Sequence, residues 1–454
     1  MFTCTLNPDA RENLCDQLYG ALREEILSGR LTGGSKLPSK RELSLHLRIS
    51  TSTVEAAYGR LTEEGYCESR PRSGVYVASR LPGERPPEKP ETPVQWDFGT
   101  GAADAARFPY ATWAHLMREV LSEESGALLT AGDPRGAEGL RRETAAMLHR
   151  MRGIDVPPEE IVFGAGTEVL VSELLALIGR EKRFAVEDPG YPRVRRILAA
   201  GGSRIVPIPL EGGAPDLRAL YASGAGAVYV TPSHQFPTGH EMDASRREAL
   251  LCWARETGGY ILEDDYDSEF RFSGEHIPAM RAQDPRVIYM NTFSRTLASG
   301  LRMSFMTLPP ALVGRFLETH SACSVPAFEQ ETLRKFMAGG FMERHIARMR
   351  TVYRARLQAL EEGVAREGVG RLRPCATGLY ALLEAGGSVP AGELVSRAAA
   401  AGVKLTRAAD YSIMEVSPQD RTVLLGFAGL DESQISEGLH ALAAAWGIRH
   451  GKNP

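Results

Sequence analysis

Five short polar segments hold the residues of this sequence whose types and spacing could do chemistry. They read GAGTE (164–168), EDPGYPR (187–193), TPSHQFPTG (231–239), EDDYDSEFR (263–271) and TFSRTLASGLR (292–302). The amides of a glycine-rich turn at a helix N-terminus suit a phosphate. Each segment alone is ambiguous, since the first could be a plain tight turn, EDDYD a solvated strand end and His234 a satisfied core histidine.

The elements around these segments predict where they lie. Short apolar or β-branched runs alternate with helical patterns, which favours a mostly parallel sheet covered on both faces. Ligands of such sheets bind at the carboxyl ends of the strands, where the polar segments fall. The expected strands are 183–188, 204–210, 227–232, 260–265, 287–293 and 303–309, and the expected helices between them are 167–180, 191–200 and 243–257.

Length and composition set the outer bounds. With 454 residues, 43% of them hydrophobic and 24% charged, the chain is expected to fold into two or three globular units. Its six cysteines are far apart, with no CxxC pair and no metal-ligand spacing, which indicates reduced thiols. The N-terminal residues do not resemble a signal peptide, and no apolar run approaches a membrane span. A soluble, cytoplasmic protein is expected.

A proline-rich stretch divides the chain. The segment PGERPPEKPETP (82–93) holds five prolines, which withhold backbone donors, so an extended linker is favoured over a surface loop. We therefore predict a DNA-binding domain at 1–78, a linker at 79–96 and a larger domain at 97–454. The larger domain is expected to comprise a large part at about 97–310 and a small α+β part at about 311–454.

The N-terminal domain has a helix-turn-helix pattern. An apolar face runs along 14–28, and Ser39 with Glu42 forms a capping-box sequence before a short helix. Ser50 or Thr51 then caps a second helix that closes at Gly65. The segment YCESRPRSGVYVAS (66–79) alternates like a two-stranded wing.

Together, LPSKREL, STSTVEAAYGRLTEEGY and RSGVYV resemble the GntR-type winged helix across residues 11–78. The resemblance implies double-stranded DNA as a partner, with Arg41 as a contact residue. Its expected neighbours at the DNA are Lys40, Ser50, Thr51, Thr53, Arg70, Arg72 and Gly74. Thr51 departs from the arginine that the family often carries at the start of its recognition helix.

The polar segments of the larger domain, in their order, resemble the fold-type I aminotransferase domain of MocR/GabR-type regulators. That family joins a GntR-type winged helix to an aminotransferase-like domain through a linker, and its cofactor is pyridoxal phosphate. The fold class implied is α/β, with a winged helix-turn-helix followed by a mostly parallel sheet and a small α+β part. The resemblance also implies a homodimer.

The resemblance assigns roles to individual residues. Asp264 would ion-pair the pyridine nitrogen of pyridoxal phosphate, Tyr266 would bond its phenolic oxygen, and Tyr191 would stack on its ring. The phosphate would be held by Gly166, Thr167, Ser294 and Arg302. Arg193 and His234 are the expected effector-binding residues.

Three departures from the family pattern argue against catalysis. Arg295 stands where the family has the lysine that bonds the cofactor covalently, and a guanidinium with a pKa above ~12 supplies no neutral amine. Ala131 stands where relatives often carry a phosphate-binding tyrosine. Leu424 stands where aminotransferases keep the arginine that holds the substrate carboxylate. We therefore expect Arg295 near the cofactor as a fixed positive charge.

The sequence thus predicts a DNA-binding transcriptional regulator, not an enzyme, whose aminotransferase-like domain senses a small molecule. Pyridoxal phosphate bound without a covalent bond is one candidate, and an amino acid or an unrelated metabolite are others. Two rival functions stay open at this point. One is a true aminotransferase with an accessory DNA-binding head, and the other is a regulator without ligand whose large domain only dimerises. Target genes, operator sequence and the sign of regulation do not follow from the sequence.

Overall fold

The structure is a computed structural model that describes residues 2–4, 6–8, 10, 12–28, 30–32, 34–70, 73–78, 92–101, 103–123, 126–274 and 277–448. The chain divides into two compact units, residues 1–91 and 92–454. Most of the predicted linker, residues 79–91, lies outside the described residues. Within the described part, no helix is long and apolar enough to cross a membrane. All six cysteines are unpaired, as the sequence predicts.

The first unit contains three helices and a two-stranded antiparallel wing. These are α1 (Leu14–Leu27), α2 (Lys40–Leu47), α3 (Thr51–Glu63), β1 (Cys67–Arg70) and β2 (Gly74–Val77). The predicted capping box is confirmed, because Ser39 and Glu42 bond each other's backbone amides. Ser50 caps α3 by accepting from the amide of Thr53. Leu18, Leu22, Leu43, Val54 and Leu61 form the core of this unit.

The second unit is built on an eight-stranded sheet with the order β4-β11-β10-β9-β8-β5-β6-β7. Its strands are β4 (Ile161–Gly164), β5 (Arg183–Asp188), β6 (Arg204–Glu211), β7 (Ala214–Pro215), β8 (Ala227–Val230), β9 (Tyr260–Asp264), β10 (Ile288–Thr292) and β11 (Ser304–Thr307). The six strands expected from the sequence are all present. The sequence analysis missed β4 and β7.

The sheet is mostly parallel, as expected. Strands β6, β5, β8, β9 and β10 run parallel, whereas β11 runs antiparallel to both of its neighbours. Because β11 reverses, β4 again points the same way as β10. The carboxyl ends of β4, β5, β8, β9 and β10 therefore meet at one edge, and each is followed by one of the five polar segments.

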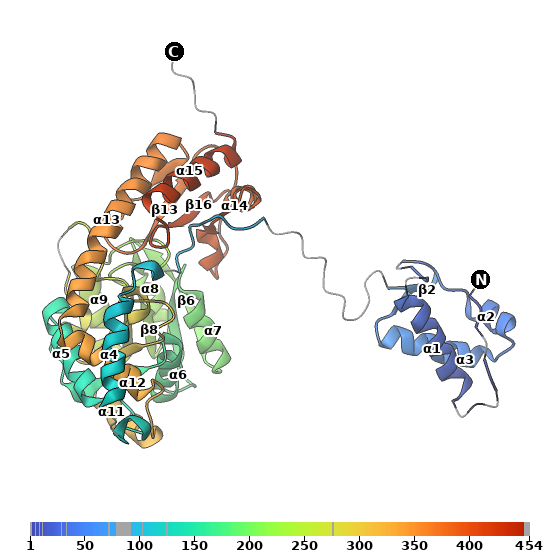
Figure 1. The fold of residues 1–454 in the computed structure, drawn as a ribbon, viewed down its shortest axis with the longest axis horizontal. Helices are drawn as coiled ribbons and strands as arrows, with labels where there is room; N and C mark the ends of the chain where they lie inside the picture. The colour runs from blue at the N-terminus through green and yellow to red at the C-terminus, as the bar shows by residue number, and fades with distance from the viewer. Residues whose placement is uncertain are drawn as a thin grey trace, which may run out of the picture. The chain divides into compact units, whose positions relative to one another are not determined.

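Helices cover both faces of this sheet (Figure 1). On one face, α6 (Thr167–Ile178), α7 (Pro192–Ala200) and α11 (Pro310–Thr319) pack on inward residues such as Val162 and Met290. The alternate residues, such as Phe163 and Tyr289, point to the other face. The helices of that face are α4 (Tyr110–Ser122), α5 (Glu138–Arg152), α8 (Leu217–Ser223), α9 (Ala244–Thr257) and α12 (Ala327–Ala338).

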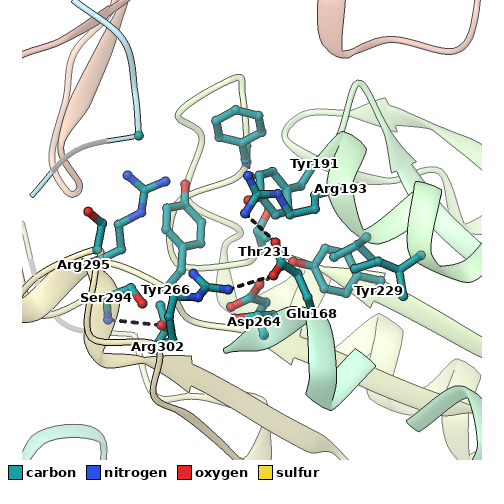
Figure 2. Close-up of a pocket in the computed structure, with 17 residues that line it drawn as sticks. Glu168, Tyr191, Arg193, Tyr229, Thr231, Asp264, Tyr266, Ser294, Arg295 and Arg302 are labelled. Carbon is teal, nitrogen blue, oxygen red and sulfur yellow. Dashed lines mark hydrogen bonds and ion pairs between the residues drawn. The ribbon is translucent and has the colours of Figure 1, made fainter. Parts of the chain in front are cut away.

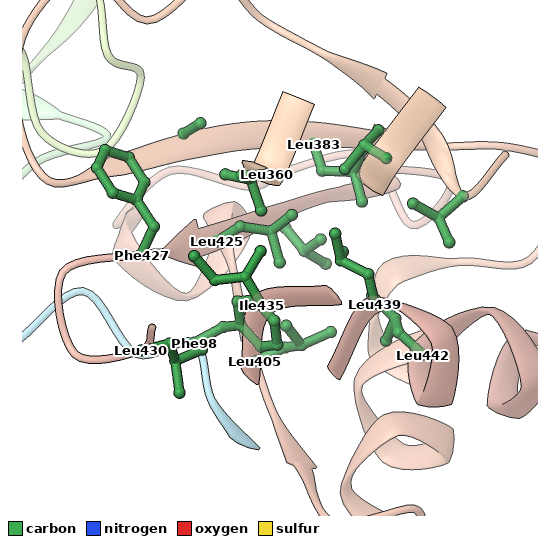
Figure 3. Packing of buried hydrophobic residues seen from close by; sticks show 14 of the residues in the cluster. Phe98, Leu360, Leu383, Leu405, Leu425, Phe427, Leu430, Ile435, Leu439 and Leu442 are labelled. Carbon is green, nitrogen blue, oxygen red and sulfur yellow. The ribbon is translucent and has the colours of Figure 1, made fainter. Parts of the chain in front are cut away.

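The C-terminal part is a small α+β layer next to the long helix α13 (Phe341–Glu367). Its antiparallel sheet has the order β12-β13-β16-β15, and α14 (Ala391–Ala400) and α15 (Glu432–Trp446) pack on it. The four strands are β12 (Gly370–Leu372), β13 (Tyr380–Ala385), β15 (Thr406–Arg407) and β16 (Thr422–Gly426). Figure 3 shows Leu425 packed among Leu360, Ile435 and other apolar side chains of this core.

The chain enters the second unit through this C-terminal part. Strand β3 (Trp96–Asp97) pairs with β14 (Val403–Lys404), and Phe98 is fully buried in the same core. A side chain at Gly426 would place its Cβ 2.3 Å from the carbonyl oxygen of Gly99. The segment that leads out of the linker is thus held tightly, and it continues to Thr100 and Gly101 beside the polar edge of the large sheet.

Candidate functional site

The polar segments converge on one cavity of about 250 Å³ at the carboxyl edge of the large sheet. Of the residues predicted to bind a cofactor or effector, it brings together Thr167, Tyr191, Arg193, Asp264, Tyr266, Ser294, Arg295 and Arg302 in its lining. Figure 2 shows these side chains reaching the cavity from several different elements. Gly166 and His234 are not part of the lining.

Asp264 lies at the end of β9 and forms the floor of the cavity. Its side chain accepts a hydrogen bond from the hydroxyl of Tyr229, which projects from the neighbouring strand β8. Only 5% of Asp264 is exposed, and its Oδ1 has no hydrogen-bond partner among the described residues. Burial raises the pKa of Asp264 to about 7. A buried, unpaired carboxylate oxygen beside a cavity is a binding position for a cationic or N–H donor group.

A second buried acid, Glu187 of β5, lies near enough to Asp264 for their charges to interact. Its Oε2 accepts hydrogen bonds from the amide and hydroxyl of Thr231 and from the side-chain amide of Gln235. Burial raises its pKa to about 7 as well. Glu187 therefore orders the TPSHQFPTG turn, whose Thr231 lines the cavity.

Arg295 lines the cavity from the short helix α10 (Phe293–Thr296). Its guanidinium donates to the backbone carbonyl of Thr100 and lies 5.8 Å from the ring centre of Tyr266. Its positive charge lowers the pKa of Asp264, although burial outweighs this effect.

The predicted phosphate-binding residues surround the N-terminus of α6. Gly166 precedes the helix with φ +97°, and a Cβ there would lie 2.4 Å from Nη2 of Arg302. Glycine therefore lets the guanidinium lie directly against the turn. Thr167 is the first residue of α6, and the Oγ of Ser294 donates to the carbonyl of Leu301 at 3.1 Å.

Glu168 is a lining residue that the sequence analysis did not single out. Its carboxylate joins two arginines, because Oε1 lies 2.5 Å from Nη1 of Arg193 and Oε2 lies 2.8 Å from Nη2 of Arg302. Both ion pairs appear as dashed lines in Figure 2. The GAGTE motif contained this residue, but nothing in the spacing showed that both arginines would reach it.

Aromatic side chains form the wall nearest the C-terminal part. Tyr191 packs edge-on against Phe236, which in turn contacts Tyr380 and Tyr411. The hydroxyl of Tyr266 donates to the backbone carbonyl of His234 at 2.9 Å. To form the predicted hydrogen bond with a cofactor oxygen, the Tyr266 hydroxyl would have to share its proton between two acceptors or turn away from His234.

His234 lies beneath the wall instead of in it. Only 2% of it is exposed, its Nδ1 is 2.9 Å from Asp267, and its ring packs 4.5 Å from that of Tyr380. This environment matches the core histidine that the sequence left as an alternative, although its Nε2 is buried without a hydrogen-bond partner among the described residues. His234 is therefore not placed to contact an effector bound in this cavity.

Leu424 and Ala131, the two other positions at which the sequence predicts a departure from the family pattern, have largely apolar neighbours. Leu424 is fully buried beside Leu382, Phe236 and Tyr380, next to the aromatic wall. Ala131 lines a separate groove of about 590 Å³, where Leu129 is 91% exposed.

The DNA-binding residues predicted in the first unit surround α2, α3 and the wing. Arg41 and Thr51 are exposed, whereas Lys40 forms an ion pair with Glu55 of α3. Ser50 and Thr53 bond each other at the start of α3. Arg70 ends β1 and Gly74 begins β2 with φ +122°, while Arg72 lies outside the described residues.

Comparisons with known proteins match both units. Residues 14–77 match the family described as bacterial regulatory proteins, gntR family, and residues 94–442 match aminotransferase class I and II. The HTH-type transcriptional regulator YdeL of Bacillus subtilis is 39% identical, over 96% of this chain and 97% of its own. The HTH-type pyridoxine biosynthesis transcriptional regulator PdxR of Corynebacterium glutamicum is 32% identical, over 95% of both chains.

Solved structures agree on the fold of the second unit. The multiple substrate aminotransferase from Thermococcus profundus superposes with a TM-score of 0.70 and 24% identity, covering 78% of this chain and 92% of that one. The chain thus has a GntR-type winged helix fused to an aminotransferase fold. It belongs to the family of HTH-type transcriptional regulators with an aminotransferase-like domain, and it is a DNA-binding regulator.

The buried carboxylate of Asp264 predicts a dependence of stability on pH. Its folded pKa is about 7 and its unfolded value is near 4, so the folded state holds the proton between these values and loses stability as pH rises through them. From about pH 5 to about pH 8, the wild type should lose about 2–3 kcal/mol relative to Asp264→Asn. Melting curves of both proteins measure this difference, which should vanish if Asp264 is ionised throughout.

Arg41 provides a test of the DNA-binding surface. Arg41→Ala should weaken binding to a DNA fragment selected by the wild-type protein by about 1–3 kcal/mol, since a lost base contact costs that much. Arg30→Ala is the matched control, because Arg30 pairs with Glu25 and its side chain is 61% exposed. Gel shifts at two salt concentrations report both effects. Equal affinity of the two variants would refute the assignment of Arg41.

Proposed function

We propose that the cavity of the aminotransferase-like domain binds pyridoxal phosphate or a close B6 derivative without covalent attachment, and that this occupancy controls DNA binding. The observation that carries the proposal is the unpaired Oδ1 of the buried Asp264, together with the half-exposed guanidinium of Arg302 in the same lining. The name of the relative PdxR, a regulator of pyridoxine biosynthesis, supports the same ligand class.

The residues present fit this cofactor in three respects. Asp264 offers an unpaired acceptor to a ring N–H, and Arg302 with the amides after Gly166 offers donors to a phosphate. Tyr191 and Tyr266 offer aromatic rings in the lining of the same cavity. When a carboxylate keeps its ring nitrogen protonated, pyridoxal phosphate acts as an electron sink.

We further propose that this chain makes no catalytic use of that chemistry. Arg295 cannot act as the amine that bonds the cofactor, and it is held by Thr100. Leu424 is enclosed by apolar side chains, so it offers no cation to a substrate carboxylate. Binding and orientation are then the tasks left to the cavity, as a ligand sensor requires.

Regulation would follow from a shift between conformations. A ligand that favours one arrangement of the aminotransferase-like domains alters the spacing of the DNA-binding heads, provided it binds the two arrangements with different affinity.

A homodimer is part of this proposal. The groove that contains Ala131 and the exposed Leu129 offers an apolar surface for a second copy, and sedimentation of the full chain should give twice the monomer mass.

The wild-type protein should form no borohydride-stable bond with pyridoxal phosphate, whereas Arg295→Lys should gain one cofactor per chain. Lysine restores an amine at the same position and keeps the positive charge. Intact mass after borohydride treatment measures the difference. Neither protein should convert amino acids to keto acids, since Leu424 is unchanged.

Arg30→Lys is the control for this experiment, because it adds an exposed lysine outside the cavity. Its mass should stay that of the wild type. A cofactor trapped on the wild type would mean that another lysine reaches the cavity, and keto-acid production by the wild type would show an active enzyme.

A further inference from the structure

The two arginines at the mouth of the cavity share one anionic partner. Arg193 belongs to the first turn of α7, and Arg302 lies just before β11. The two guanidinium groups nevertheless contact the two oxygens of the same carboxylate, Glu168, at 2.5 and 2.8 Å. Figure 2 shows both reaching it from different elements. They are therefore aimed at one position, not at two.

The surroundings of Glu168 favour an anion larger than a carboxylate. Glu168 lies in the first turn of α6, whose N-terminal amides attract negative charge, and Gly166 caps this helix without a side-chain bond. A Cβ at Gly166 would collide with Arg302, so the turn is shaped around that guanidinium. The carboxylate of Glu168 carries a single negative charge opposite two arginines. A phosphate monoester carries about two negative charges and has three acceptor oxygens.

The other end of the cavity points to the same kind of ligand. Asp264 has an unpaired oxygen there and is 5% exposed, so the lining presents an acceptor at its floor and two cations at its mouth. A ligand with an N–H group at one end and a phosphate at the other complements both. The sequence had divided the arginines, with Arg302 for a phosphate and Arg193 for an effector carboxylate.

We propose that Arg193 and Arg302 form a single phosphate-ester subsite, and that Glu168 is its internal competitor. Without ligand, Glu168 holds both arginines; with ligand, the phosphate replaces it on both. The identity of the ligand rests on the function proposed above, but the subsite itself rests on these three side chains.

The exchange is feasible because the existing ion pairs are accessible to water. The side chains of Arg193, Arg302 and Glu168 are 55%, 45% and 39% exposed, and ion pairs of this kind contribute little to stability. Charge-assisted bonds from arginine to phosphate are stronger, particularly when two guanidinium groups converge. Glu168 thus keeps the arginines in place at little cost and sets the threshold for ligand binding.

The test is a calorimetric titration of the full chain with inorganic phosphate, pyridoxal phosphate and pyridoxal. Glu168→Gln keeps the shape and removes the competing charge, so it should bind phosphate and pyridoxal phosphate about tenfold more tightly than the wild type. Pyridoxal, which has no phosphate, should bind both proteins equally. Glu318→Gln, an exposed residue of α11 outside the cavity, is the control with the same change of charge.

Arginine variants test whether the subsite is shared. Made in the Glu168→Gln background, Arg193→Gln and Arg302→Gln should each weaken phosphate binding about tenfold or more. If only Arg302→Gln does so, Arg193 serves a separate anion and the shared subsite is refuted. Equal phosphate affinity of the wild type and Glu168→Gln would refute the competitor role.

The outcomes separate this inference from the proposed function. Tighter phosphate binding by Glu168→Gln, with no binding of pyridoxal phosphate by any variant, would confirm the subsite and overturn the cofactor assignment. If pyridoxal phosphate binds with an affinity that substitutions of Glu168 and Arg193 do not change, the cofactor assignment is supported and the shared subsite is overturned.

Discussion

The burial of the Asp264 carboxylate is the constraint on which the site depends. A carboxylate removed from water without full hydrogen bonding is costly, and here one oxygen is held by Tyr229 while the other has no partner among the described residues. The raised pKa of Asp264 expresses that cost. A ligand that supplies a donor to this oxygen relieves it, so the cavity is built to gain stability when occupied.

The fold brings the other groups to this carboxylate through a single topological feature. Since five strands end at the same edge, residues more than a hundred positions apart, such as Thr167 and Ser294, border one cavity. Arg295 then links the cavity to Thr100, in the segment that follows the linker and is anchored by Phe98. Arg295 thus contacts the backbone of the segment through which the chain enters the second unit.

Much of the fold could be predicted from the sequence, because it depends on local patterns. The capping box at Ser39 and the strand 183–188 follow from residue types within a few positions. The short strand β4 and the reversed direction of β11 could not be predicted, since pairing partners and direction are set by tertiary packing. Similarly, the sequence identified eight of the residues that line the cavity, but it missed Glu168 and the partners of the side chains that it did identify.

Glu168 and His234 show why those partners were missed. Glu168 adjoins a predicted phosphate turn, yet its role depends on two arginines from distant elements. His234 lies in a polar motif, yet its partner Asp267 and the ring of Tyr380 hold it below the cavity surface. The partners of both residues depend on how side chains are placed in three dimensions, which neither spacing nor periodicity encodes.

The most direct test of the central claim is the affinity of the full chain for pyridoxal phosphate, measured by equilibrium dialysis on the wild type and Asp264→Asn. The carboxamide keeps the size of the side chain but removes the charge that pairs with a protonated ring nitrogen. We expect one cofactor per wild-type chain, released unmodified on denaturation, and binding at least about tenfold weaker in the variant. Equal affinity of the two proteins would contradict the account.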